Sequence, residues 1–340
     1  MADGEDTLID RLFFKDGEVI DNKYRVISQY KPGSNSNVYR CIDLANNSEV
    51  VIKCFRLIGD LGNKFLELLA FYNNLQKIQD ASNYFCKFYD WFKFDGHTCI
   101  VMEKYGPSLY DIMNFYKFKG WRLEAIRQIL TQIVKSLIIL RSAGRLHGDL
   151  KPENILIDPS VKITDIDMFI NIGDPQPRSL HVKLIDLESG SKYYEWGRNL
   201  ITTIYYRAPE VILGLPWGHE IDQWSLGCIA LELYFGKISF SPGESVANLF
   251  GIQHMIGPFP ENMIDGCTIP KFKKLFENGI INPKYINQES YEALVSCTPL
   301  YRLEMDSDLK DLILKLLSID PFQRPSLDEI LNHPFLLPSD

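Results

Sequence analysis

The sequence predicts an α+β fold of two unequal lobes, a small β-rich lobe with one main helix and a larger helical lobe. Short segments rich in β-branched and aromatic residues fill the N-terminal third, whereas helical periodicity dominates the remainder. Gly106-Pro107 separates the two regions. Strands first and helices afterwards are typical of an α+β protein. We therefore expect a polar leader over 1–22, the small lobe over 23–104 and the larger lobe over 105–340.

Strands dominate the predicted small lobe. The segments KYRVISQY, NSNVYRCIDL and EVVIKCFRL are short, rich in β-type residues and bounded by Gly, Pro, Asn or Asp, as strands are. Apolar residues then recur at steps of three and four from Leu61 to Leu75, which is the period of a helix. The segments FCKFYDWFKF and HTCIVMEKY complete the lobe as two further strands.

Helices dominate the predicted larger lobe. The segment LEAIRQILTQIVKSLIILRSAG repeats apolar residues at helical spacing and stops at Gly144, a residue type that commonly ends a helix. Further helices are predicted at IDQWSLGCIALELYF, DLKDLILKLL and SLDEILNHPF.

Composition excludes several classes of function. The net charge of −8 argues against broad binding to nucleic acid or to an anionic membrane. The seven cysteines include no C-x-x-C pair, so neither a metal site nor a disulfide framework is indicated. No apolar run is long enough to span a membrane. We expect an intracellular protein of the nucleus, the cytoplasm or both, with reduced thiols and with no nucleic-acid or membrane partner.

The strand ending in VVIKCF contains a lysine, Lys53, among apolar residues. A buried ammonium needs a partner, and Glu67 is the only acidic residue between Leu61 and Gln79. A lysine on a strand paired with a glutamate on the next helix is how protein kinases hold ATP phosphates. The alternative is a lysine on an edge strand that reaches solvent.

The stretch HGDLKPENIL places Asp149, Lys151 and Asn154 at the offsets of a kinase catalytic loop. In that signature the aspartate orients the substrate hydroxyl or accepts its proton, and the asparagine holds Mg²⁺. The lysine can neutralise charge on the phosphate being transferred. Asp186 in KLIDLESG follows an apolar strand, as the magnesium-binding aspartate of D-F-G does. Taken singly, each match could be a turn with chance acidic residues.

The order of these motifs along the chain indicates the family. Ala208-Pro209-Glu210 in YYRAPEVIL, then IDQWSLGC and PFQRP, complete the set, and such an ordered series does not arise by chance. From about Tyr24 to Leu337 the chain resembles the eukaryotic protein kinases. The resemblance implies a bilobal kinase fold, ATP and Mg²⁺ as cofactors, and protein substrates.

Within the kinases, the chain resembles the LAMMER family of the CMGC group, dual-specificity kinases that phosphorylate serine/arginine-rich splicing factors. Gly148 is a small residue at the position of the threonine in the family's His-Thr-Asp motif. Residues 158–181 match the hairpin that the family has inserted after the catalytic loop. NLITTIYYRAPEVILG resembles the family's LVSTRHYRAPEVIL, and the C-terminal segment is similar as well. The resemblance implies a Ser/Thr kinase, with dual specificity as an option, that acts as a monomer on Arg/Ser-rich proteins.

The resemblance also implies roles for individual residues. Asn154 and Asp186 would bind magnesium, Arg324 would pair with Glu210, and Asp222 would anchor the backbone of the catalytic loop. A further set would contact ATP through the phosphate loop, the adenine slot, the gatekeeper and the hinge: Gly33, Val38, Val51, Lys53, Met102, Glu103, Tyr105 and Leu156.

Several positions depart from the family pattern. The phosphate loop reads KPGSNS, in which only Gly33 remains of three glycines, and Val51 replaces alanine in the adenine slot. DLES replaces DFGS, so that Glu188 stands at a hinge glycine. These changes leave open a pseudokinase scaffold with weak or no nucleotide turnover. Gly148 also removes the arginine that usually grips an activation-loop phosphate, so we expect no need for an upstream kinase.

Overall fold

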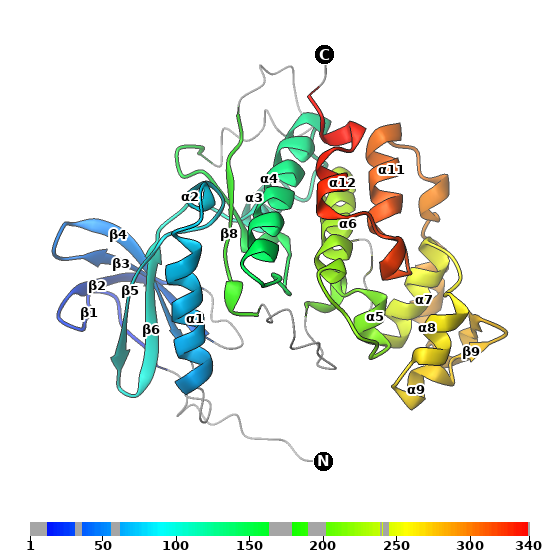
Figure 1. Cartoon of the computed structure of the whole chain (residues 1–340), viewed down its shortest axis with the longest axis horizontal. Helices are drawn as coiled ribbons and strands as arrows, with labels where there is room; N and C mark the ends of the chain where they lie inside the picture. The colour runs from blue at the N-terminus through cyan, green and yellow to red at the C-terminus, as the bar shows by residue number, and fades with distance from the viewer. Residues whose placement is uncertain are drawn as a thin grey trace. The chain divides into compact units, whose positions relative to one another are not determined.

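A computed structural model describes residues 12–30, 36–55, 62–162, 179–189, 202–238, 240 and 245–338. The chain divides into two compact units, Met1–Tyr105 and Gly106–Asp340, and each is described by itself. The first contains a β-sheet with few helices and the second is mainly helical (Figure 1). The α+β class expected from the sequence is therefore confirmed.

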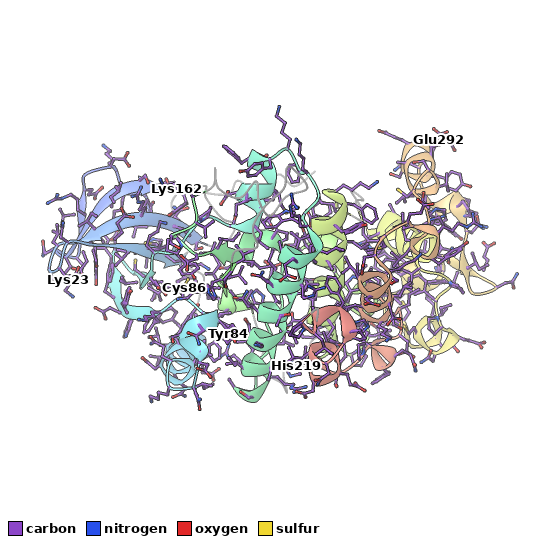
Figure 2. All side chains as sticks on the ribbon, turned by 90° about the horizontal axis from the view of Figure 1, so that it is seen from above. Lys23, Tyr84, Cys86, Lys162, His219 and Glu292 are labelled. Carbon is purple, nitrogen blue, oxygen red and sulfur yellow. The ribbon has the colours of Figure 1, made fainter. Side chains whose placement is uncertain are left out.

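The N-terminal unit is built on a six-stranded antiparallel sheet in the order β1-β2-β3-β4-β6-β5. Alternate residues of the central strands are buried, because successive side chains of a strand point to opposite faces. Lys23, in the turn between the first two strands, lies at the outer tip of the sheet (Figure 2). The strands are β1 (Val19–Ile20), β2 (Tyr24–Gln29), β3 (Ser36–Asp43), β4 (Ser48–Phe55), β5 (Phe88–Phe94) and β6 (His97–Glu103).

One long helix, α1 (Gly62–Leu75), packs on this sheet, and the short helix α2 (Ala81–Tyr84) follows it. Phe65 of α1 meets Phe55 of β4 at a ring-centroid distance of 5.8 Å and Trp91 of β5 at 5.9 Å. Tyr72, two turns further along, stacks on Phe88 at 5.4 Å. These aromatic contacts fix the helix against β4 and β5.

Part of the predicted polar leader over 1–22 packs on the sheet of the N-terminal unit. Val19–Ile20 forms β1, and the Phe14 side chain is only 7% exposed. Its ring packs edge-on against Tyr39 at 5.2 Å and against Phe94 at 5.3 Å. These apolar residues stand in short runs, Leu12–Phe14 and Val19–Ile20, between charged and polar ones, so they give no periodic signal. Strands β2, β3 and β5 supply their partners.

The C-terminal unit surrounds α6, which is buried over most of its length. α4 ends at Ser142 with Gly144 at φ 71°, so the predicted C-terminal glycine signal is confirmed. No helix among the described residues is long and apolar enough to cross a membrane. The helices are α3 (Leu109–Phe115), α4 (Leu123–Ser142), α5 (Pro209–Ile212), α6 (Glu220–Phe235), α7 (Ser245–Met255), α8 (Glu261–Gly266), α9 (Pro270–Lys273), α10 (Gln288–Val295), α11 (Ser307–Leu316) and α12 (Leu327–Leu331).

Two small ladders accompany the helices. β7 (Ile155–Ile157) pairs with β8 (Val182–Leu184), and β9 (Phe276–Glu277) pairs with β10 (Ile280–Ile281), both antiparallel. β7 begins at the end of the HGDLKPENIL stretch and β8 precedes Asp186, so this ladder carries the candidate site. The inserted hairpin predicted over 158–181 lies mostly outside the described residues.

Candidate active site

The backbone of the HGDLKPENIL stretch is held by a buried carboxylate on α6. His147 N donates to Asp222 Oδ2 at 2.7 Å, and Gly148 N donates to Oδ1 at 2.9 Å. Asp222 is 2% exposed. Burial raises the pKa of its carboxyl group, and the hydrogen bonds from the two N–H groups oppose that rise. The anchoring role implied for Asp222 is confirmed by these two bonds.

Gly148 has a φ of 77°, which is the left-handed region where glycine carries no steric penalty. In the sequence, this position stands out because it lacks the usual arginine. The structure adds that its backbone is left-handed. A side chain here would add strain of about 1–2 kcal/mol unless other contacts offset it.

The His147 ring joins this loop to the strand that leads to Asp186. Asp149 N donates to Nδ1 at 3.2 Å, so Nδ1 is an acceptor and the ring proton is on Nε2. Nε2 then donates to Ile185 O at 3.0 Å. The imidazole is buried and spans the two backbone segments that carry the predicted catalytic residues.

Three donors hold the carboxylate of Asp149. Thr203 N and Thr203 Oγ1 donate to Oδ1 at 2.9 and 2.8 Å, and Lys151 Nζ donates to Oδ2 at 2.6 Å. Lys151 Nζ also donates to Thr203 Oγ1 at 2.9 Å. Asn154 Nδ2 donates to the Asp149 carbonyl oxygen at 2.8 Å. The predicted residues Asp149, Lys151 and Asn154 thus form one hydrogen-bonded group.

Sequence reasoning missed Thr203 as a member of this group. It lies 54 residues beyond Asp149, in the NLITTIYYRAPEVILG segment. In the sequence, this segment is notable only for its resemblance to the family. Asn248 of α7 and Ser225 of α6 donate to the carbonyl oxygens of Ile204 and Tyr206 at 2.9 and 2.8 Å. These bonds fix the segment that presents Thr203.

The residue before Thr203 has an unusual backbone. Thr202 has a φ of 69°, which is rare for a β-branched residue and costs energy. Its carbonyl oxygen accepts two hydrogen bonds from the Arg207 guanidinium, at 3.2 and 2.6 Å. Arg207 therefore stabilises the turn that delivers Thr203 to Asp149.

Asp186 follows β8 directly and has a φ of 70°, a conformation that is uncommon outside glycine and concentrated at functional sites. Ile185 N donates to Asn154 O at 3.0 Å, so the β7–β8 ladder ends with Asn154 beside the residue preceding Asp186. The next residue, Leu187, is 3% exposed. Its burial accounts for an apolar side chain at this position.

An amide oxygen and a carboxylate suit Mg²⁺, which takes one or two protein ligands and completes its shell with water and phosphate oxygens. Asn154 and Asp186 supply such a pair. Among the described residues no group of three or more His, Cys, Asp or Glu side chains is arranged to hold a metal by itself. An amide oxygen and one carboxylate fit a magnesium ion that takes its remaining ligands from water and phosphate.

In the N-terminal unit, four of the residues implied to contact ATP gather on one face of the sheet. Val38 of β3 is opposite Lys53 of β4, and Val51 of β4 is opposite Met102 of β6. The buried core lies on the other face, around Tyr39 and its neighbours. Gly33 is outside the described residues, and Leu156 is on β7 in the C-terminal unit.

Lys53 is half-buried, and its ammonium lies 5.4 Å from the centre of the Phe55 ring, within cation–π range. Glu67 is on α1, the helix that packs on β4 through Phe55 and Phe65. Glu103 ends β6, where its backbone N–H donates to Lys87 O at 2.8 Å. Tyr105, the last residue of this unit, is buried.

A buried ion pair braces the APE segment. Arg324 Nη1 and Nη2 donate to Glu210 Oε1 and Oε2 at 2.6 and 2.9 Å, and both side chains are fully buried. The guanidinium also lies 5.2 Å from the Trp224 ring centre on α6. The predicted pairing of Arg324 with Glu210 is confirmed.

Comparisons with known proteins agree with this geometry. A family model described as the protein kinase domain matches residues 24–336. Serine/threonine-protein kinase AFC1 of Arabidopsis thaliana is 32% identical, over 94% of this chain and 72% of that protein. Dual specificity protein kinase CLK1 of Homo sapiens is 31% identical, over 97% of this chain and 69% of that protein.

The fold has a counterpart among solved structures. A crystal structure of a kinase domain matches with a TM-score of 0.82 at 30% identity, covering 97% of this chain and 99% of the other. The predicted kinase fold and the resemblance to the LAMMER kinases are confirmed. The chain belongs to the protein kinase family, and its relatives there are serine/threonine and dual-specificity kinases of the LAMMER type.

Proposed function

We propose that this kinase transfers the γ-phosphate of ATP to serine or threonine hydroxyls of Arg/Ser-rich protein substrates. Protein kinases as a family use ATP and Mg²⁺. The observation that carries the proposal is the hydrogen-bonded group formed by Asp149, Lys151 and Thr203, which holds the Asp149 carboxylate in one orientation beside the Lys151 ammonium.

Asp149 would orient the substrate hydroxyl and receive its proton. Its Oδ1 is held by Thr203, and its Oδ2 is shared with the Lys151 ammonium. A carboxylate fixed by three donors loses little freedom when a hydroxyl approaches, which is how positioning lowers a barrier. Lys151 is 20% exposed and can offer its charge to the phosphoryl group while staying close to Asp149.

Asn154 and Asp186 would hold magnesium, which when bound neutralises charge on the nucleotide phosphates. Lys53, braced by Glu67, would hold the α- and β-phosphates. Val38 and Val51 would cover the adenine, Met102 would be the gatekeeper, and Glu103 and Tyr105 would offer hinge backbone groups. Phosphoryl transfer depends mainly on such positioning and electrostatic stabilisation.

Charge supports the choice of Arg/Ser-rich substrates. The chain carries a net charge of −8, and arginine pairs with carboxylates through two parallel hydrogen bonds that give both affinity and register. Glu188 of the DLES segment is a candidate contact. Glu195, a second candidate, lies outside the described residues. We further propose a monomer that works in the nucleus, the cytoplasm or both, without binding nucleic acid.

The substrate preference can be tested with peptides. We expect the purified chain to transfer radiolabelled phosphate faster to an Arg-Ser repeat peptide than to acidic or proline-directed peptides. The rate on the Arg-Ser peptide should fall several-fold as ionic strength rises, because exposed charge pairs are screened. A matched Lys-Ser peptide should be poorer, since lysine cannot form the bidentate pair.

The outcomes separate the alternatives. A clear preference for an acidic or proline-directed peptide would remove the proposed specificity but keep the kinase. No transfer to any peptide, with no thermal stabilisation by Mg-ATP, would favour the pseudokinase scaffold. Asp149→Asn serves as the inactive control for residual contaminating activity.

A further inference from the structure

Two cysteines of the N-terminal unit face each other across neighbouring strands. Cys54 of β4 is the register partner of Cys99 of β6, and the two sulfur atoms are 3.2 Å apart. Both are free thiols, with residue exposures of 3% and 0%. They belong to the core face of the sheet. Lys53, Val38, Val51 and Met102 are on the other face.

Strand geometry already meets the requirement of a covalent link. Opposed residues of an antiparallel pair have Cα atoms about 4.5–5.5 Å apart, which is inside the range of about 4.4–6.8 Å that a disulfide spans. The sulfur atoms would need to approach by only about 1 Å to reach the bond length. No shift of strand register is needed.

We propose that Cys54 and Cys99 form a redox modification site that closes into a cross-strand disulfide when the chain meets a small two-electron oxidant. With an azodicarboxamide, one thiolate adds to the N=N bond and the second attacks the sulfur thus formed. The S–S bond forms, the S–N bond breaks, and both thiol protons end on the hydrazine product. The two sulfurs lose two electrons and the azo group gains them.

Burial sets the speed of this reaction. The hydrogen bond with Cys99, followed by burial, raises the pKa of the Cys54 thiol, so the reactive thiolate is scarce at neutral pH. Oxidant also has to enter through a local opening of the sheet. Disulfide formation should therefore be slow, and it should accelerate with rising pH and with denaturant below the unfolding transition.

The chain offers a matched control in Cys41. This residue is fully buried on β3 in the same core, but its register partner on β4 is Val50. Treatment of the full chain with the azodicarboxamide, followed by alkylation under denaturing conditions and peptide mapping, should show a Cys54–Cys99 link and the loss of two hydrogen masses. Cys54→Ala and Cys99→Ala should lose the link, and Cys41→Ala should keep it.

Two results would overturn the proposal. One is that folded wild-type protein keeps all its thiols after long exposure to the azodicarboxamide in mild denaturant. The other is a link that joins different cysteines. The peptide map of the wild-type protein decides the matter even if an alanine variant fails to fold.

A second, independent observation concerns the free edge of β8. On one side β8 pairs with β7. Towards α4, two glutamines take the place of a third strand. Gln132 Oε1 accepts from Val182 N at 3.1 Å, and its Nε2 donates to Leu180 O at 2.7 Å. Gln128 Oε1 accepts from Leu180 N at 2.7 Å.

This contact lies at the base of the insertion and four residues before Asp186. The base is closed by Asp158 N, which donates to His181 O at 3.0 Å. An amide side chain that both donates and accepts copies the pairing of a neighbouring strand, and it satisfies backbone groups that would otherwise be left without partners. It therefore fixes the register of β8 against α4.

We infer that Gln132 is a positioning residue for Asp186, because it holds the strand that leads to this aspartate. The inference rests on the proposed function, in which Asp186 binds magnesium. If β8 is loosened, the two ligands Asn154 and Asp186 should hold the ion less firmly. Substrate peptide contacts should be unaffected.

Gln132→Glu tests this with an isosteric side chain. The carboxylate can still accept from Val182 N but cannot donate to Leu180 O. We expect the Mg²⁺ concentration for half-maximal thermal stabilisation in the presence of ATP to rise about tenfold, as one or two lost hydrogen bonds imply. The Mg²⁺ concentration for half-maximal activity should rise in parallel, with a lower kcat and an unchanged KM for peptide. Ser136→Ala is the matched control, because this buried hydroxyl of α4 bonds only within the helix, to Gln132 O at 2.7 Å.

The results distinguish this inference from the proposed function. An unchanged magnesium requirement in an active Gln132→Glu variant, or an equal rise in Ser136→Ala, would overturn the positioning role. Wild-type protein without magnesium-dependent transfer would instead count against the proposed function.

Discussion

Asp149→Asn is expected to lower kcat by about a thousandfold or more while leaving the melting temperature nearly unchanged. The asparagine amide keeps the size of the side chain but cannot receive the proton of the substrate hydroxyl, a role worth about 10²–10⁴ in rate. It also replaces one of the two carboxylate oxygens with an NH₂ group, which donates and cannot accept from Lys151 as Oδ2 does at 2.6 Å. Phosphotransfer and thermal melting on the same preparation measure both effects.

Two further variants accompany this one, because they remove charge at other points of the proposed mechanism. Lys53→Met and Asp186→Ala should also abolish transfer in a folded protein, since these residues act through electrostatics. Thr203→Val, which keeps the N–H bond to Asp149 but loses the hydroxyl bond, should reduce kcat to a smaller extent. A variant with normal melting and an undiminished rate would remove its residue from the mechanism.

Arg324→Met is expected to lower the free energy of unfolding of the C-terminal unit by about 3–5 kcal/mol, because it leaves a charged partner buried and uncompensated. Glu210 is fully buried and receives two hydrogen bonds from this guanidinium. Arg324 also donates to Ser318 O and Glu220 O. The midpoint of urea unfolding, followed by the tryptophan signal, is the measurement.

The double variant Glu210→Met/Arg324→Met is the control for this prediction. Removing both charges eliminates the uncompensated carboxylate, and apolar residues of similar volume often replace a buried ion pair at little cost. The double variant should therefore be more stable than Arg324→Met alone, and the difference measures the coupling. Equal urea midpoints for wild type and Arg324→Met would contradict the prediction that this buried ion pair stabilises the C-terminal unit.

Local patterns in the sequence were sufficient for the three longest helices of the described residues, for α11 and α12, and for strands β2 to β6. The period of the α4 segment and its glycine stop predict that helix, and the residue types of β2 to β6 predict the strands. The leader could not be predicted in the same way. Phe14 and Ile20 become core residues because they pack against β2 and β3. A periodic pattern in the sequence does not predict such a contact.

The residues of the candidate site also fall into a group that the sequence predicts and a group that it does not. Asp149, Lys151 and Asn154 are close in sequence, so their spacing predicts their proximity. Thr203 could not be predicted from spacing, because it reaches Asp149 only through a turn in which Thr202 takes a left-handed backbone held by Arg207. Gly148 is a related case, since the missing arginine is visible in the sequence and the φ of 77° is not.

The sequence by itself determined the family, the order of the motifs and the chemical types that the reaction requires, because these depend on residue identity and short offsets. The tertiary structure alone decided which distant groups meet. The contacts of Thr203 with Asp149 and of Gln132 with the edge of β8 depend on the path of the chain, and the contact of Cys54 with Cys99 depends on strand register. These are long-range properties, and in the third case a shift of one residue would turn one of the two side chains to the other face of the sheet.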